Sequence, residues 1–264
     1  MRARTNHSIF IAAIAALAFS GVTRIQELPP LAPDEIPAAI RDAVSAVDRP
    51  IEDKELDAGR SPAQMLAFFG IERGMKVADL WAGGGYTTEL LARVVGPTGK
   101  VYSQEPVFPP DRKQIEDAWT ERLKKPVLAN VVAVHKSFAD ADFLPAPAGS
   151  LDRVVMNMNY HDLVLQSIDR AKVNSAVFRA LRKGGIYGIV DHSAKSGAGR
   201  ESLELHRIDQ VFVTDEVQKA GFRLQSASSA LRRPDDDRTW STSPKVAGQK
   251  RGTSDRFMLR FVKP

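Results

Sequence analysis

The sequence predicts an α/β fold with a seven-stranded, mostly parallel sheet, helices on both faces and an antiparallel last strand. Three observations predict it. Short apolar segments alternate with helical segments from residue 77 to residue 227, and a glycine-rich turn opens this alternation. The chain then ends on two strand-like segments with no helix between them. The alternation indicates parallel strands covered on both faces, whereas the last two segments indicate an antiparallel pair bridged by residues 228–256.

The expected elements follow from hydrophobic periodicity and from the residues that end each segment. The strands cover residues 77–81, 100–104, 131–134, 151–156, 186–190, 222–227 and 257–262. The helices cover residues 36–47, 62–69, 87–95, 115–123, 167–181 and 211–220. Ser61 and Pro62 are typical of a helix start, with Ser61 as the N-cap and Pro62 as the first helical residue. Gly70 and Gly221 are typical of helix ends.

The composition excludes several classes of site. Apolar residues make up 43% of the 264 residues and charged residues 26%, as in an ordinary globular protein with a sizeable core. The net charge is +5, but the Lys and Arg residues are scattered and form no basic stripe with aromatic residues, so we expect no nucleic-acid partner. The chain has no cysteine, which excludes disulfides, thiolate metal sites and a cysteine nucleophile.

Residues 1–20 have the organisation of a secretory signal peptide. Arg2 and Arg4 give a positive start, residues 8–22 are almost all apolar or small, and residues 16–18 offer a cleavage site of the form Ala-x-Ala. An overlapping site two residues later is a second candidate. The apolar run is shorter than the roughly 20 residues that a membrane-spanning helix needs, so we expect cleavage and export to the periplasm or the medium. An uncleaved N-terminal anchor is the alternative.

The rest of the chain divides into two parts. Residues 21–56 are expected to form a proline-rich linker and a helical arm, and residues 57–264 the main domain. We expect no membrane contact beyond the leader, because no later segment is long and apolar enough to span a bilayer. The acidic run 235–237 is expected to be a solvated turn.

The strongest motif is the segment 77–90, VADLWAGGGYTTEL, which joins the first strand of the alternating series to its helix. Its consecutive glycines, Gly83, Gly84 and Gly85, allow a sharp turn and a close approach of the backbone to a ligand. In an open α/β sheet, ligands bind at this edge, where the parallel strands end. The turn does not match G-x-G-x-x-G from Gly83, because Thr88 stands where the last glycine is required, so a dinucleotide is not the expected ligand.

The segment resembles the first motif of class I S-adenosylmethionine-dependent methyltransferases, with an acidic residue, Asp79, ahead of the glycines and Trp81 in place of the first glycine. The segments 151–162, 181–185 and 220–222 resemble later motifs of the same family in the same order. The resemblance implies a Rossmann-like fold and S-adenosylmethionine as the cofactor. The residues that it implies for cofactor binding are Asp79, Trp81, Gly83, Gly84, Gly85, Glu105 and Asn157.

Glu105 ends the second strand of the alternating series. A carboxylate at this place can accept hydrogen bonds from two ribose hydroxyls of a bound nucleoside. A surface glutamate at a strand end is the alternative interpretation.

Polar side chains follow the fourth and fifth of these strands. Tyr160, His161 and Asp162 come after one strand, and Asp191 and His192 come after the next. The carboxyl ends of parallel strands share one edge, so these side chains should face the same crevice as the glycine turn. A neutral histidine there can take a proton from a nucleophile that attacks the methyl group.

The candidate catalytic residues are therefore His161, Tyr160 and His192. The alternative is that His161 caps a helix and His192 satisfies a backbone group. His206, Arg207, Asp209 and Arg60 are further candidates for lining the crevice.

A metal site is also possible from the side-chain types of His161, Asp162, Asp191 and His192. The spacing of these residues in the sequence does not establish the geometry of such a site. We therefore expect no metal. The expected function is methyl transfer from S-adenosylmethionine to an unidentified small-molecule acceptor, which the segment 228–256 would select. The alternatives are a non-catalytic periplasmic ligand-binding protein on the same scaffold, and other chemistry on a nucleoside-like ligand.

Overall fold

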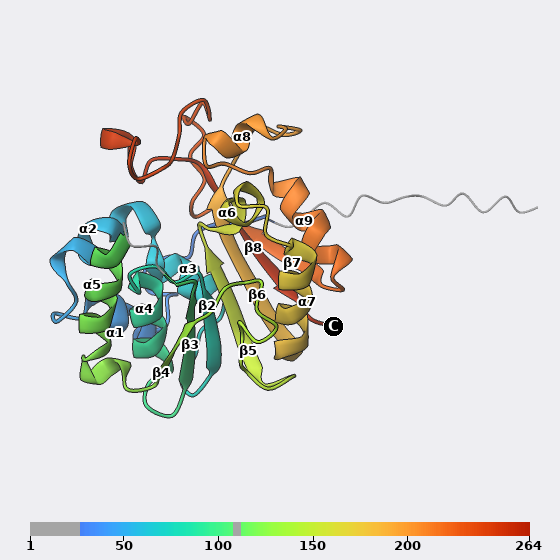
Figure 1. Ribbon diagram of the computed structural model, residues 1–264. Coiled ribbons are helices and arrows are strands. Elements are labelled where there is room, and N and C mark those ends of the chain that lie inside the picture. The colour runs from blue at the N-terminus through green and yellow to red at the C-terminus, as the bar shows by residue number, and fades with distance from the viewer. Residues whose placement is uncertain (1–26, 108–111) are drawn as a thin grey trace, which may run out of the picture.

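An eight-stranded sheet runs through the molecule and carries helices on both faces (Figure 1). The computed structural model describes residues 27–107 and 112–264, so the expected leader lies outside the described residues. The strand order is β1-β7-β8-β6-β5-β2-β3-β4. The strands are β1 Glu27–Leu28, β2 Lys76–Leu80, β3 Lys100–Glu105, β4 Val131–His135, β5 Leu151–Asn157, β6 Leu181–His192, β7 Arg223–Ser228 and β8 Arg256–Val262.

Most helices of the described residues lie on one or the other face of the sheet, whereas α6 and α8 lie at its end (Figure 1). They are α1 Ala38–Ser45, α2 Ile51–Arg60, α3 Pro62–Phe68, α4 Tyr86–Val95, α5 Lys113–Leu123, α6 Tyr160–Leu165, α7 Arg170–Ala180, α8 Glu201–Glu204 and α9 Gln210–Lys219. Short 3-10 turns cover Pro126–Leu128 and Gly248–Lys250. Within the described part of the chain, no helix combines the length and the apolar character that a membrane crossing requires.

The predicted fold class is confirmed, and the predicted strand count is wrong by one. Every strand pair that does not include β8 is parallel. β8 lies between β6 and β7 and is antiparallel to both. The predicted antiparallel pair is therefore present, with β8 inside the sheet. The additional strand is β1, which lies within the expected linker and pairs with β7. Its two residues are too few to produce a periodic pattern.

Some helix expectations need correction. α2, α6 and α8 were not expected, because α2 is mostly polar and the other two are short. α7 begins at Arg170, where the Asp169 side chain accepts a hydrogen bond from the Lys172 N–H at 3.0 Å. Pro62 is the first residue of α3 as expected, but Ser61 has φ +44° and makes no side-chain cap bond, because the same residue also ends α2.

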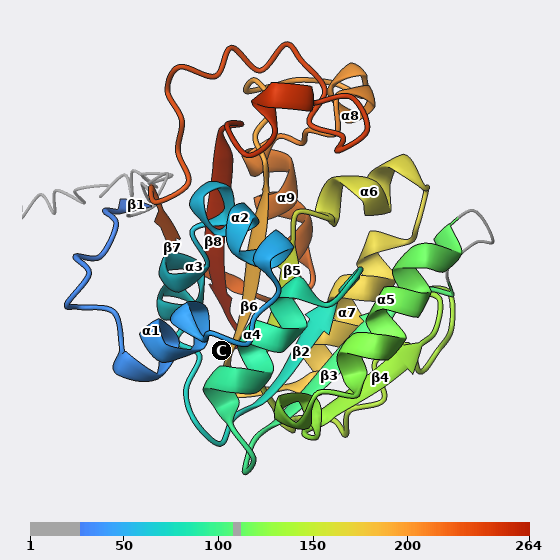
Figure 2. The same ribbon diagram turned by 90° about the vertical axis from the view of Figure 1, so that its left-hand side faces the viewer.

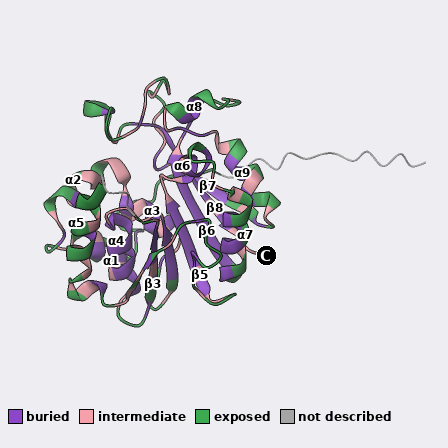
Figure 3. Cartoon of the chain, in the orientation of Figure 1, coloured by how far each residue is buried: buried purple, intermediate pink, exposed green. Residues whose placement is uncertain are grey.

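The core lies on both faces of the sheet. Val154 and Met156 of β5 face one apolar cluster, with α7 and α9, whereas Val155 between them faces the other, with α3 and α4. This alternation is the burial pattern of a strand covered on both sides. Figure 3 shows the strands as the most continuously buried part of the chain. Ile40 of α1 also belongs to the second cluster, so the predicted arm is packed into the main body.

A buried carboxylate fastens the arm to the helices beside the sheet. The side chain of Glu89 on α4 is 1% exposed and binds Arg93 and Arg122 at 2.7 Å and 3.0 Å. Arg122 of α5 also forms a bidentate pair with Asp53 of α2, at 2.5 Å and 3.0 Å. Bidentate arginine–carboxylate pairs restrict the relative orientation of the elements that carry them. α2 therefore has a fixed place without a continuous apolar face.

The segment between β7 and β8 is held by buried charges. Figure 2 shows it as the orange-red loop over the end of the sheet that carries α6 and α8. Arg207 and Asp236 form a bidentate pair at 2.8 Å and 3.2 Å, with side chains 0% and 1% exposed. Asp255 accepts from Arg238 at 2.7 Å and from the Arg233 N–H at 2.8 Å. The expectation of a solvated acidic turn is thus wrong for Asp236.

Removal of the Asp236 carboxylate should therefore destabilise the fold. Asp236→Ala leaves the guanidinium of Arg207 buried without its partner, and we expect a loss of about 3–5 kcal/mol in the free energy of unfolding. The neighbouring Asp237→Ala is the matched control, because that side chain bonds only within its own turn, to Thr239. Urea unfolding measures both variants. Equal losses would contradict a buried pair at Arg207.

Candidate active site at the carboxyl edge of the sheet

One edge of the sheet brings most of the predicted site residues together. β2, β3, β5 and β6 are mutually parallel neighbours, so their carboxyl ends lie side by side. This edge carries the glycine turn after β2, Glu105 at the end of β3 and Asn157 at the end of β5. His161 follows β5 on α6, and Asp191 lies at the end of β6.

Trp81 takes the backbone conformation that usually favours glycine. Its φ is +57°, in the left-handed region. Its N–H donates to Oε1 of Gln104 at 3.1 Å, its carbonyl accepts from Nδ2 of Asn159 at 3.0 Å, and its ring packs on Phe138 with centroids 5.4 Å apart. These contacts hold the strained residue in place. The turn therefore keeps its shape although the first glycine is missing.

The glycines of the turn have different surroundings. A Cβ on Gly83, whose φ is +57°, would meet no atom within 4 Å. A Cβ on Gly85, whose φ is +83°, would lie 2.1 Å from the ring of Trp119 on α5, which is buried against the turn. At Gly84 the nearest atom would be 3.9 Å away, on Ile115. Gly83 therefore borders open space, whereas Gly85 is required by packing within the protein.

Two buried carboxyl groups lie beside the turn. Glu105 is 5% exposed and accepts the N–H of Gly83 at 2.6 Å. Burial raises the pKa of Glu105 to about 7; the Gly83 N–H opposes this rise, and the charge of Asp79 adds to it. Burial also raises the pKa of Asp79 to about 7, against the hydrogen bond from the Thr88 hydroxyl at 2.7 Å. Asp79 thus binds the first turn of α4 through Thr88, whereas Glu105 binds the glycine turn itself.

Two asparagines connect the ends of β2 and β5. Asn157 donates from Nδ2 to the hydroxyl of Thr87 at 3.1 Å, which links β5 to the first turn of α4. Asn159 donates to the carbonyls of Trp81 and Asn157, each at 3.0 Å. Side-chain amides therefore fix the distance between the glycine turn and α6.

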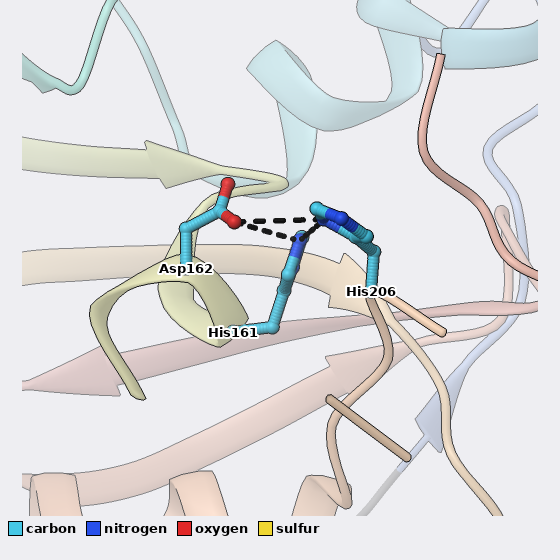
Figure 4. Close-up of side chains that lie close together, drawn as sticks. All are labelled: His161, Asp162 and His206. Atoms are coloured by element: carbon cyan, nitrogen blue, oxygen red, sulfur yellow. Dashed lines mark hydrogen bonds and ion pairs between the residues drawn. The ribbon is translucent and has the colours of Figure 1, made fainter. Parts of the chain in front are cut away.

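The residues after Asn159 contribute to a cluster of histidines and carboxylates, of which Figure 4 shows His161, Asp162 and His206. Nδ1 of His161 lies 2.7 Å from Oδ1 of Asp191, and the His161 backbone N–H donates to Oδ2 of Asp191 at 2.8 Å. On the other side of the ring, Nε2 of His161 lies 3.2 Å from Nδ1 of His206. Oδ1 of Asp162 lies 3.5 Å from both of these nitrogens. His161 is therefore held by one carboxylate and faces a second histidine and a second carboxylate.

His161 and His192 have opposite pKa shifts. Burial by itself would lower the pKa of His161, but the adjacent carboxylate of Asp191 outweighs burial and raises it. Burial lowers the pKa of His192 well below its usual value, and His161 and Arg256 add to this effect. The Nδ1 of His192 lies 2.8 Å from the hydroxyl of Ser254. His192 is thus a neutral neighbour of His161, with ring centroids 5.9 Å apart.

The predicted catalytic role of Tyr160 does not agree with its position. Its side chain is fully buried, and its hydroxyl lies 3.0 Å from Oε2 of Glu216 on α9 and accepts from Asn174 of α7 at 2.8 Å. Burial raises the pKa of this hydroxyl above its usual value. Tyr160 therefore joins α6 to the helical layer. The alternative role of His161 as a helix cap also fails, because Asp191 accepts the His161 N–H and Asn159 is the N-cap residue of α6.

Three further candidates from the sequence serve the framework. Arg60 stacks on the ring of Tyr86 at 4.3 Å, Arg207 is bound to Asp236, and Asp209 accepts the N–H of Val211 at the start of α9. His206 is the one member of that group that reaches the histidine cluster, and the sequence contained no signal for its pairing with His161. Trp119 was not predicted, because only the packing of α5 brings it onto Gly85.

Comparison with known proteins is consistent with this geometry. The family model of protein-L-isoaspartate(D-aspartate) O-methyltransferase matches residues 44–140. The ubiquinone/menaquinone biosynthesis C-methyltransferase UbiE of Photorhabdus laumondii is 26% identical over 189 residues, which cover 68% of each chain. The UbiE of Cronobacter sakazakii is 29% identical over 125 residues, and this match spans only 45% of that protein.

The fold also matches solved structures. A SAM-dependent methyltransferase from Aquifex aeolicus superposes with a TM-score of 0.56 at 19% identity, covering 82% of this chain and 99% of that chain. This likeness concerns the fold.

Gly83 and Gly85 should respond differently to a methyl group. Gly83→Ala adds only the strain of a left-handed alanine, about 1–2 kcal/mol. Gly85→Ala adds the same strain and must displace the Trp119 ring, and overpacking costs a further ~1–3 kcal/mol. Chemical unfolding of both variants measures the difference. The double variant Gly85→Ala with Trp119→Leu should lose less stability than the sum of its single variants, and strict additivity would contradict the contact.

Proposed function

We propose that this chain is a class I S-adenosylmethionine-dependent methyltransferase that transfers a methyl group from S-adenosylmethionine to a small-molecule acceptor. Members of this family are enzymes that use this cofactor. The observation that carries the proposal for this chain is the buried carboxylate of Glu105 beside the open face of Gly83. The acceptor, the residues that act on it and the place of action in the cell are part of the proposal.

The residues at the edge of the sheet fit the cofactor. Gly83 leaves room where a side chain would stand, so the backbone of the turn can approach a ligand closely. Glu105 ends β3 next to it, where a carboxylate can accept hydrogen bonds from the two ribose hydroxyls. Trp81 preserves the left-handed turn without glycine. Asp79 supports the turn from below through Thr88.

S-adenosylmethionine, when bound, supplies an electrophilic methyl group on a sulfonium. The part of this chain that faces the acceptor is the cluster around His161. Because Nδ1 of His161 donates to Asp191, Nε2 carries the lone pair and points toward His206 and Asp162. That nitrogen can take the proton of the attacking nucleophile or orient the acceptor. Asp191, which is 0% exposed, fixes the tautomer on which either role depends.

The segment between β7 and β8 is proposed to select the acceptor. A cavity of about 660 Å³ lies between α2 and this segment. Its lining includes Trp240, cations such as Arg233 and Lys250, and carboxylates such as Glu55 and Asp235. A wall of aromatic and polar groups on an irregular segment is a common basis for substrate choice.

The leader is the observation that favours a second candidate function. Residues 1–20 are expected to direct export to the periplasm, and S-adenosylmethionine is made in the cytoplasm. A non-catalytic binding protein on the same scaffold would hold a ligand at Glu105 and yield no product. Intact-mass measurement of the protein from a periplasmic extract tests the export. A full-length mass found only in the cytosol would contradict it.

The first test of the cofactor site is the affinity of Glu105→Gln. Hydrogen bonds to a charged group contribute about 1.5–3 kcal/mol each, so losing this charge should weaken binding of S-adenosylhomocysteine about tenfold to a hundredfold. The affinity of the parent should also fall by up to about tenfold per pH unit below 7, because the protonated carboxyl must release its proton to bind the ribose. Calorimetric titration between pH 6 and pH 8 measures both effects.

Two matched variants sharpen this test. Glu105→Gln should lose most of the pH dependence. Asp79→Asn should keep it with a lower midpoint, because removal of the neighbouring negative charge favours ionisation of Glu105. Equal affinity of the parent and Glu105→Gln, or no binding by the parent, would remove the cofactor assignment.

The second test concerns the acceptor side. His161→Asn should lower turnover by about 10²–10⁴-fold and leave the affinity for S-adenosylhomocysteine nearly unchanged. Tyr160→Phe is the comparison, because its hydroxyl is bound to Glu216 and Asn174; it should lower the melting temperature and retain turnover. A panel of mixed acceptors with labelled S-adenosylmethionine measures both variants. Unchanged turnover in His161→Asn would refute its role, and no turnover by the parent would favour the binding protein.

A further inference from the structure

We propose that His161, Asp162 and His206 bind one divalent transition-metal ion, with Zn²⁺ as the best match. Figure 4 shows the three side chains converging on one point at the end of the sheet, from α6 and from the segment that follows α8. Two imidazoles and one carboxylate are typical zinc ligands, and three protein ligands are typical of zinc sites that keep a position open for substrate. The sequence pointed to Asp191 and His192 as partners of His161 and Asp162, whereas the structure supplies His206.

The separations of the donor atoms match a bound ion. Nε2 of His161 and Nδ1 of His206 are 3.2 Å apart, and each lies 3.5 Å from Oδ1 of Asp162. Ligands about 2.1 Å from a tetrahedral zinc ion lie about 3.4 Å from one another. The three atoms therefore stand at the corners of a triangle of the right size without any movement of the chain.

His161 is already oriented as a metal ligand. Its Nδ1 is bound at 2.7 Å by the buried carboxylate of Asp191, which leaves Nε2 for the ion. A carboxylate behind a ligating histidine is the usual arrangement in zinc sites, where it fixes the ring and its tautomer. Asp191 also accepts the backbone N–H of His161 at 2.8 Å, so the ring and the helix that carries it are held together.

His206 is held in place by a strained backbone. Its φ is +52°, a left-handed conformation that is uncommon outside glycine. The Thr242 hydroxyl donates to the His206 carbonyl at 2.7 Å, and the next residue, Arg207, is anchored in its buried pair with Asp236. Strain of this kind gathers at sites where a side chain must point in one direction. The segment between β7 and β8 therefore positions the third ligand.

A hydrogen-bond relay explains the cluster less completely. One shared proton would account for the 3.2 Å contact between His161 and His206. It would leave Asp162 with ion pairs alone, because its carboxylate lies 3.5 Å from both rings, beyond a good hydrogen bond. Among the described residues, no other side chain binds this carboxylate within hydrogen-bond distance. A cation between the three groups satisfies all of them.

The open positions on the ion define a class of acceptor. His206 is 30% exposed at its side chain, so the site has a route from solvent. A divalent ion with three protein ligands can bind a hydroxyl, phenol or carboxylate oxygen and lower the pKa of a hydroxyl bound to it. With Nε2 of His161 on the ion, this activation takes the place of the base role of that nitrogen. If the proposed methyl transfer is correct, on which this step rests, the acceptor carries such an oxygen next to the atom that is methylated.

The metal site is tested on the full-length protein, independently of methyl transfer. After dialysis against a chelator, Zn²⁺ is titrated in competition with a chromophoric chelator, and Co²⁺ spectra report the coordination geometry. The parent should bind one ion per chain. His206→Ala should lower Zn²⁺ affinity at least 100-fold, and Asp191→Asn about 10–100-fold. His135→Ala, which removes an exposed histidine on β4, is the matched control and should bind like the parent.

The outcomes separate this proposal from the proposed function. Absence of Zn²⁺ binding in the parent, or equal binding by His206→Ala, would overturn the metal site even if S-adenosylhomocysteine binds normally. Zn²⁺ binding that depends on His206 supports it, even if the parent binds no S-adenosylhomocysteine, which would count against the methyltransferase function alone. Thermal melting of each variant without metal verifies that it is folded.

Discussion

The carboxylate of Asp191 is the interaction on which the rest of the site depends. It is fully buried at the end of β6 and accepts three N–H groups, the backbone N–H and ring Nδ1 of His161 and the backbone N–H of His192. A buried carboxylate is costly unless hydrogen bonds of this kind satisfy it. Its partners join the end of one parallel strand to the helix that follows its neighbour. The position of α6, the tautomer of His161 and the direction of Nε2 all follow from this one group.

Buried charge has a similar role elsewhere in the molecule. The pair of Arg207 and Asp236 holds an irregular segment over the edge of the sheet, and Glu89 with Arg122 holds α2 beside α4. α2 is mostly polar, and the segment between β7 and β8 is largely irregular. Ion pairs with fixed geometry hold both in place, because breaking one leaves an uncompensated charge in the interior. The segment and α2, which line the proposed acceptor site, are therefore held in fixed positions.

The glycine turn combines two requirements that look identical in the sequence. Gly83 faces open space and Gly85 faces the Trp119 ring, so only the first is explained by a ligand. Trp81 takes the left-handed conformation without being glycine, because Gln104, Asn159 and Phe138 hold it there. The departure of Trp81 from the methyltransferase motif therefore leaves the shape of the turn intact.

The sequence by itself determined the features that depend on local pattern. Apolar runs such as residues 151–156 predicted strands covered on both faces, and the glycines and Glu105 predicted where a ligand would lie, because parallel strands end at one edge. Tertiary structure alone decided which polar side chains meet there. Tyr160 and His161 are neighbours in the chain, yet one side chain points into the helical layer and the other toward His206. Such pairings, and the edge strand β1, depend on contacts between residues far apart in the sequence, which no local periodicity encodes.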